Sequence, residues 1–149
     1  MRAGWLGALA GGPLARAEER QAEELAIEAL GRVGLAGRAG ASGASLSFGE
    51  AKLVEIARAL VMSPRLLMLD EPMAGVPHAD QQRFIALIRE LHAAGVSVLL
   101  VEHNMRVVMQ LCDEILVLSQ GRRLAEGTPE AIRRDPGVIA AYLGEDTGG

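Results

Sequence analysis

Two adjacent carboxylates close a short apolar run near the middle of the chain. Residues 66–69 are all apolar, and Asp70 and Glu71 follow directly before Pro72. The run is too short for a helix and suits a strand buried on both faces, whose carboxyl end is where open α/β sheets bind ligands. One carboxylate there can hold a hydrated Mg²⁺ while the other orients a water. From this stretch alone, a buried strand that ends in two solvated acids is an equal alternative.

Two further polar stretches stand before and after these acids. Ser47 and Glu50 form the capping-box pattern of a helix N-terminus, and Gly49 would allow an anion to approach the free N–H groups closely. His103 follows the apolar run 96–101, where it could donate to a phosphate oxygen or to an attacking water. Taken singly, the first is a simple cap and the second a surface histidine. The order and spacing of the three stretches favour a common site.

The apolar pattern predicts the elements that would position these residues. Four helices are expected: 15–33, a second from Ser47 to Val61, a third marked by Phe84 to Leu91, and a fourth capped by Asn104. The first should bury an apolar face made of Ala22, Leu25, Ala26, Ala29, Leu30 and Val33, with a small, flexible connector after it at 38–44.

The strands at 66–70 and 96–101 flank the third helix, which predicts a βαβ unit with parallel strands. A hairpin over 114–126, turning at Gln120-Gly121, and two short helices that begin at Thr128-Pro129 and Asp135-Pro136 complete the chain.

Composition narrows the possible function classes. The chain has 149 residues, half of them apolar, so it is one ordinary domain or a piece of a larger one. Its net charge of −4 gives no support to a nucleic-acid surface. Cys112 is the sole cysteine, which excludes an internal disulfide. No apolar run is long enough to span a bilayer, and glycines dilute a start that superficially resembles a signal peptide, so export is not expected.

These motifs resemble those of the ATP-binding subunits of ABC transporters. Residues 46–50 resemble the signature motif, usually Leu-Ser-Gly-Gly-Gln, residues 66–70 the Walker B strand, Glu71 the catalytic glutamate and His103 the switch histidine. The aromatic third signature residue, Ala74-Gly75-Val76, and a tail with Gly-Thr-Pro-Glu at 127–130 and Ala-Tyr-Leu-Gly at 141–144 are most similar to branched-chain amino-acid importers. The resemblance implies an α/β fold, a partial P-loop-type nucleotide-binding domain with a helical signature subdomain at 1–64 and part of the ATPase core and tail at 65–149.

The resemblance also implies roles for single residues. Asp70 would bind Mg²⁺ through water, Glu71 would act as general base, and His103 would contact the γ-phosphate of ATP. The signature residues would contact the nucleotide held by a second ATP-binding subunit; they are Ser47, Phe48, Gly49 and Glu50. Membrane-spanning permease subunits would be further partners. The chain itself would lie in the cytoplasm, on the inner face of the membrane, without inserting into it.

The sequence departs from the family pattern in three places. No Gly-x-x-x-x-Gly-Lys-[Ser/Thr] loop is present, so the chain is expected to be a C-terminal portion that neither binds ATP tightly nor hydrolyses it alone. Glu50 replaces the usual Gln, and Pro77 stands where the loop after Walker B usually carries Asp or Asn.

The strand at 66–70 should also expose an apolar edge that promotes association.

Other functions remain open. A non-enzymatic remnant or interaction module that docks on a transporter partner would use the same motifs. A chromosome-maintenance ATPase would carry long heptad coiled coils beside the signature, and the sequence has none. A plain structural α/β domain with accidental motifs is the remaining alternative.

Overall fold

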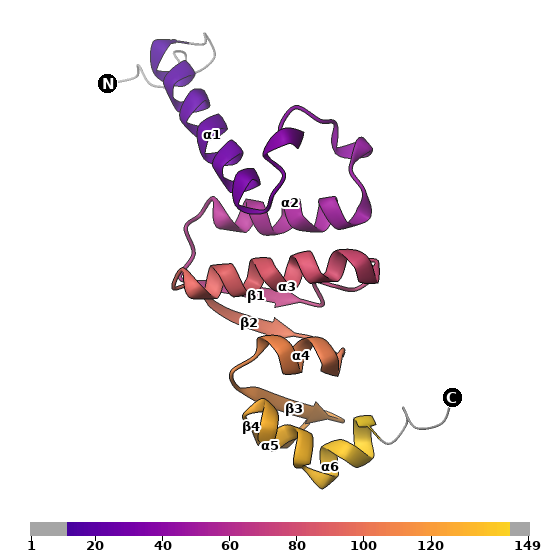
Figure 1. Ribbon diagram of the computed structural model, residues 1–149. Helices are drawn as coiled ribbons and strands as arrows, with labels where there is room; N and C mark the ends of the chain where they lie inside the picture. The colour runs from indigo at the N-terminus through magenta and orange to yellow at the C-terminus, as the bar shows by residue number, and fades with distance from the viewer. Residues whose placement is uncertain (1–11, 144–149) are drawn as a thin grey trace.

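The computed structural model describes residues 12–143, which fold into helices and two small sheets (Figure 1). The signal-like start at 1–11 lies outside the described residues. In chain order the elements are α1 (Pro13–Arg32), η1 (Ala36–Arg38), η2 (Gly43–Ser45), α2 (Phe48–Leu60), β1 (Leu66–Asp70), α3 (His78–Ala93), β2 (Ser97–Val101), α4 (Met105–Leu111), β3 (Ile115–Ser119), β4 (Arg122–Gly127), α5 (Pro129–Arg134), α6 (Pro136–Val138) and a closing π-helical turn, η3 (Ile139–Leu143).

The strand pairs match the sequence prediction. β1 and β2 are parallel, with Leu66 opposite Ser97 and Asp70 opposite Val101, so their carboxyl ends lie together. β3 and β4 form the predicted antiparallel hairpin. Its turn residues Gln120 and Gly121 have φ of 49° and 73°, the left-handed pair that a two-residue hairpin turn requires.

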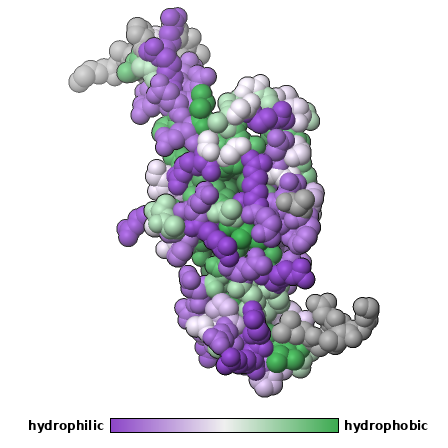
Figure 2. Space-filling view, viewed as in Figure 1, coloured by the Kyte–Doolittle hydropathy of each residue, from purple (hydrophilic) through white to green (hydrophobic). Residues whose placement is uncertain are grey.

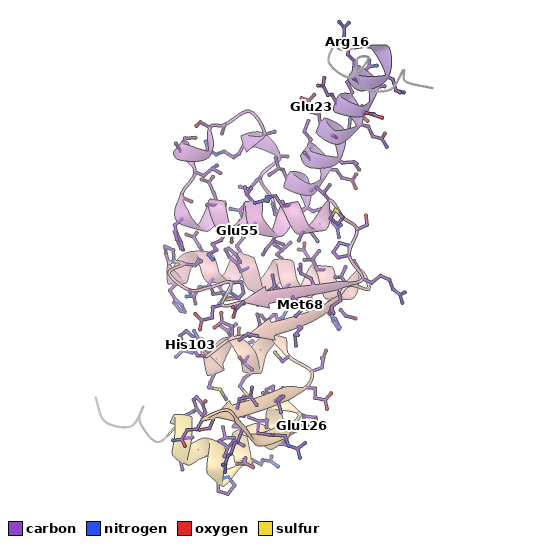
Figure 3. All side chains as sticks on the ribbon, turned by 180° about the vertical axis from the view of Figure 1, so that it is seen from behind. Arg16, Glu23, Glu55, Met68, His103 and Glu126 are labelled. Atoms are coloured by element: carbon purple, nitrogen blue, oxygen red, sulfur yellow. The ribbon has the colours of Figure 1, made fainter. Side chains whose placement is uncertain are left out.

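The prediction that β1 is buried on both faces is wrong. Leu67 is buried at 4% exposure, whereas Met68 beside it is 68% exposed. Side chains alternate along a strand, so one whole face is open. Helices α2 and α3 cover the other face, and no described residue covers the open one (Figures 1 and 3). We call this open face the bare strand face; its exposed apolar residues are Leu66, Met68, Leu99 and Val101.

Two apolar cores hold the described chain together. The larger one joins the end of α1, α2, α3 and the covered face of the β1–β2 sheet, with Phe84 and Leu53 almost fully buried. The smaller one joins α4, the β3–β4 hairpin, α5 and α6 around Ile132 and Val138. The larger core crosses the subdomain boundary proposed at residues 64 and 65, and that division remains a prediction.

Helix α1 packs only through its last turn. Ala29, Leu30 and Val33 join the larger core, but the predicted face is wrong toward the N-terminus, where Ala22, Leu25 and Ala26 are exposed. The helix projects away from the rest of the molecule, and its visible surface is mostly polar (Figures 1 and 2). Periodicity gave the apolar side of the helix correctly, yet nothing in residues 12–143 packs against its first turns.

Arg83 of α3 fastens the end of α1 to the core. Its Nη2 donates to the carbonyl oxygens of Gly34 at 2.7 Å and Val33 at 3.3 Å. Gly34 has φ of 72°, and a Cβ there would lie 2.9 Å from Nη2 of Arg83. Glycine therefore serves here both to end the helix and to let the guanidinium approach the backbone.

Membrane-spanning helices are a separate question. Across residues 12–143, no helix is long and apolar enough to cross a membrane.

Candidate nucleotide site

The carboxyl ends of β1 and β2 bring Glu71 and His103 together. Oε1 of Glu71 lies 3.1 Å from Nδ1 of His103, although 32 residues separate them in sequence. Glu71 has a left-handed φ of 42°, and its N–H donates to the carbonyl oxygen of Val101 at 2.9 Å. Such a conformation costs about 1–3 kcal/mol in a non-glycine residue and is typical of functional sites. The parallel pairing thus holds Glu71 in the turn that aims its side chain at His103.

Asp70 is the last residue of β1 and lies on the bare strand face. Leu66 and Met68 share that face with it, and its carboxylate makes no hydrogen bond or ion pair with any described residue. No group of three or more potential metal ligands exists within residues 12–143. A single free carboxylate still fits Mg²⁺, because this ion keeps several waters and commonly takes only one or two protein carboxylates beside substrate phosphates.

The signature residues form the start of α2 as predicted. Ser47 caps the helix: its Oγ accepts the N–H of Glu50 at 3.2 Å, and Oε2 of Glu50 accepts the N–H of Ser47 at 2.8 Å. Both halves of the capping box are therefore present. Gly49 is buried, whereas the ring of Phe48 is 55% exposed.

The carboxyl group of Glu50 is held in its charged form. The hydrogen bond from the Ser47 N–H is the main reason that the pKa of Glu50 lies below its usual value, partial burial opposes this lowering, and the charge of Arg38 supports it. Nε of Arg38 lies 3.2 Å from Oε1 of Glu50. The charge that replaces the usual Gln thus has a positive neighbour.

The signature segment touches the loop that follows Glu71. A Cβ placed on Gly75, which has φ of 73°, would lie 3.1 and 3.3 Å from ring carbons of Phe48. One placed on Gly49 would lie 3.6 Å from a carboxylate oxygen of Asp80 in the first turn of α3. The first contact joins the signature segment to the loop at 71–77, and the second joins it to the start of α3.

The structure therefore divides the predicted site. Glu71 and His103 are in contact, whereas no hydrogen bond or ion pair among the described residues links the Asp70 carboxylate or Ser47 to either of them. Arg38 and the Phe48–Gly75 contact were not found by sequence reasoning. The negative charge of Glu50 indicated that a positive side chain should lie nearby. No spacing rule identifies Arg38 as that side chain, because it precedes Glu50 by twelve residues and lies in a connector.

Comparison with known proteins shows the family to which the chain belongs. A family model described as "ABC transporter" matches residues 9–74, and one described as "Branched-chain amino acid ATP-binding cassette transporter" matches residues 122–147. The chain belongs to the ABC-transporter ATP-binding family. The second match covers the tail, the region that already resembled the branched-chain importers in sequence.

Curated members of the family give the same result. The chain is 46% identical over 134 residues to the high-affinity branched-chain amino acid transport ATP-binding protein BraF of Pseudomonas aeruginosa, covering 89% of this chain and 52% of BraF. It is 42% identical over 134 residues to the corresponding protein LivG of Escherichia coli, with the same coverage of 89% and 52%. The chain thus spans about half the length of the curated relatives it matches.

Solved structures of ABC ATP-binding cassettes share the fold. The ADP conformation of MJ1267 superposes with a TM-score of 0.74 at 33% identity, over 81% of this chain and 49% of that one. The cbiO1 protein of Clostridium perfringens, part of the transporter complex cbiONQ, gives 0.72 at 31% identity, over 83% and 49%. The predicted α/β class and the partial P-loop-type fold are therefore confirmed.

Proposed function

We propose that this chain is the C-terminal portion of an ATP-binding subunit that couples ATP binding and hydrolysis to solute import, with branched-chain amino acids as the solute. The observation that carries the proposal is the contact between Glu71 and His103 beside Asp70 at the carboxyl edge of two parallel strands. The proposed partners are a second ATP-binding subunit and membrane-spanning permease subunits, which would hold the chain at the inner face of the cell membrane.

The residues at the strand ends would divide the chemistry among them. Asp70 would hold a hydrated Mg²⁺, which supplies charge neutralisation at the phosphates of ATP. Glu71 would orient and deprotonate the attacking water as general base. Because the contact with His103 engages Oε1, Oε2 is the oxygen positioned to accept that proton. His103 would fix the carboxylate through one ring nitrogen and present the other to the γ-phosphate.

The signature segment would serve a nucleotide held by the second subunit. Ser47 and Gly49 lie at the N-terminus of α2, where free N–H groups and the helix dipole favour an anion. Neither residue makes a side-chain hydrogen bond or ion pair with Glu71 or His103, so one chain would contribute to two different nucleotides. Without a glycine-rich phosphate loop in its sequence, the chain alone is proposed to be inactive as an ATPase.

A chimera tests the proposal. The N-terminal half of Pseudomonas aeruginosa BraF, joined to this chain, should show magnesium-dependent ATP hydrolysis, and the unjoined chain should show none. Glu71→Gln in the chimera should lower kcat by roughly 10²–10⁴-fold, the usual contribution of a general base. Glu90→Gln, an exposed acid of α3, is the matched control and should leave turnover unchanged. An unjoined chain whose hydrolysis is abolished by Glu71→Gln would refute the proposed inactivity, and full activity of that variant in the chimera would refute the role of Glu71.

The bare strand face favours a second candidate, a non-enzymatic module that docks on a transporter partner. Four large apolar side chains stand half-exposed or more on two neighbouring strands, as docking surfaces do. The same Glu71→Gln variant separates the two candidates. When this chain is mixed with intact BraF, a docking module should change the ATP turnover of BraF. The change should be the same for the unsubstituted chain and for its Glu71→Gln variant.

A further inference from the structure

The signature helix begins with a negative charge that is unusual for its proposed task. Oε2 of Glu50 occupies the N–H of Ser47 at 2.8 Å, so one of the free donors at this helix end is already taken. A carboxylate in the first turn stabilises the helix by countering the positive end of its dipole. By the same electrostatics, it weakens the attraction of that end for an anionic ligand.

Arg38 contacts the backbone of Ser45, which precedes Ser47, and the carboxylate of Glu50, which follows it. Its Nη2 donates to the carbonyl oxygen of Ser45 at 2.9 Å. Its Nε lies 3.2 Å from Oε1 of Glu50, an ion pair without hydrogen-bond geometry. The two side chains are only 39% and 24% exposed. One guanidinium therefore contacts both sides of the signature serine.

The other charged groups around Glu50 come from α3. Arg83, which caps the end of α1, also lowers the pKa of Glu50, after the hydrogen bond from Ser47 and the charge of Arg38. Asp80 lies beside Gly49, one residue away in sequence. Arg38 is the group in direct ion-pair contact with the Glu50 carboxylate.

We propose that Arg38 is a positioning residue for the signature motif: it holds the segment from Ser45 to Glu50 in place and neutralises Glu50, so that the helix end keeps its attraction for a phosphate group. The identity of that phosphate, a nucleotide held by a second subunit, rests on the proposed function. The positioning itself depends only on contacts within this chain.

A pH titration of the chain alone tests the positioning. The amide signal of Ser47 in a nitrogen–proton NMR spectrum should titrate with Glu50, whose carboxylate it binds. In Arg38→Met the titration midpoint should rise toward the pKa of an unperturbed glutamate. Exchange of the amide with solvent should become about twofold to fivefold faster, as expected for a lost, partly exposed ion pair. Arg38→Lys should restore much of the midpoint.

The matched control removes another arginine–glutamate pair. Arg134 lies 2.7 Å from Glu130 in α5, far from the signature in sequence. Arg134→Met should leave the Ser47 midpoint and exchange rate unchanged. A midpoint that stays the same in Arg38→Met, or one that moves equally in Arg134→Met, would overturn the proposal.

The chimera with the N-terminal half of BraF tests the consequence for function. Arg38→Met should lower kcat/KM for ATP about twofold to fivefold. Adding Glu50→Gln to that variant should restore the rate, because the uncompensated charge is then gone. A double variant as slow as Arg38→Met would overturn the neutralising role. Absence of hydrolysis in the unsubstituted chimera would instead refute the proposed function, while the titration of Ser47 would still decide the role of Arg38.

Discussion

Replacing Gly75 by alanine probes the contact between the signature segment and the loop after Glu71. The new methyl group would meet two strains at once. The φ of 73° at Gly75 is left-handed, which costs an L-residue about 1–2 kcal/mol. The methyl carbon would also lie 3.1 and 3.3 Å from the ring of Phe48, closer than carbon atoms normally pack.

The two strains can be separated because the chain contains a matched glycine. Gly121 in the hairpin turn has the same φ of 73°, and a Cβ there would meet nothing within 4 Å. Gly121→Ala should therefore show the backbone cost alone, about 1–2 kcal/mol. Overpacking commonly adds about 1–3 kcal/mol. The ring of Phe48 is 55% exposed and has room to move, so we expect the lower end, about 1 kcal/mol more for Gly75→Ala.

Urea unfolding followed by circular dichroism gives the measurement. With an m-value of about 2 kcal/mol/M, an extra 1 kcal/mol lowers the midpoint of Gly75→Ala by about 0.5 M relative to Gly121→Ala. Phe48→Ala in the Gly75→Ala background should recover that difference, because the clash partner is gone. Equal midpoints for the two glycine variants, or no recovery in the double variant, would refute the contact between Phe48 and Gly75.

Three further predictions concern the core, the cysteine and the bare strand face. Ile132→Ala, at a 1% exposed position, should destabilise the chain by about 2–5 kcal/mol in the same urea assay, whereas Leu118→Ala, at 55% exposure, should cost less than about 0.5 kcal/mol. Burial, and next the charge of Asp113, raises the pKa of the Cys112 thiol, so its alkylation at pH 8 should be slower than that of a free thiol and should speed up in Asp113→Asn; equal rates would contradict this. Met68→Glu should lower the binding of an apolar dye and should also lower the self-association measured by light scattering. Unchanged values would show that the chain does not self-associate through the bare strand face.

The sequence predicted best what depends on neighbours a few residues away. The capping box at Ser47 and Glu50, the Asn104 cap of α4 and the Gln120–Gly121 turn all rest on local hydrogen bonds or local φ angles, and each is present. The parallel pairing of β1 and β2 was also predicted from local sequence patterns, because a strand, a helix and a second strand at this spacing favour parallel pairing.

Contacts between distant segments could not be predicted from the sequence. Arg38 reaches Glu50 across a connector, and Arg83 reaches Gly34 across 49 residues, so no periodicity links them. The predictions of which residues of α1 and β1 are buried were wrong for a related reason. The patterns of α1 and β1 show which side is apolar, but burial depends on whether another segment packs there, and Leu25 and Met68 have no such neighbour among the described residues.

The alternation of β1 has a thermodynamic consequence for the proposed magnesium site. Leu66, Met68 and Asp70 project from the same side of one strand, so any polypeptide that buries the two apolar side chains also encloses the carboxylate. Enclosure lowers the local dielectric and strengthens the attraction between a carboxylate and a divalent cation. If Asp70 holds Mg²⁺ as proposed, hydrophobic assembly and cation affinity would be linked equilibria: the factor by which covering the sheet changes magnesium binding equals the factor by which bound magnesium changes the covering.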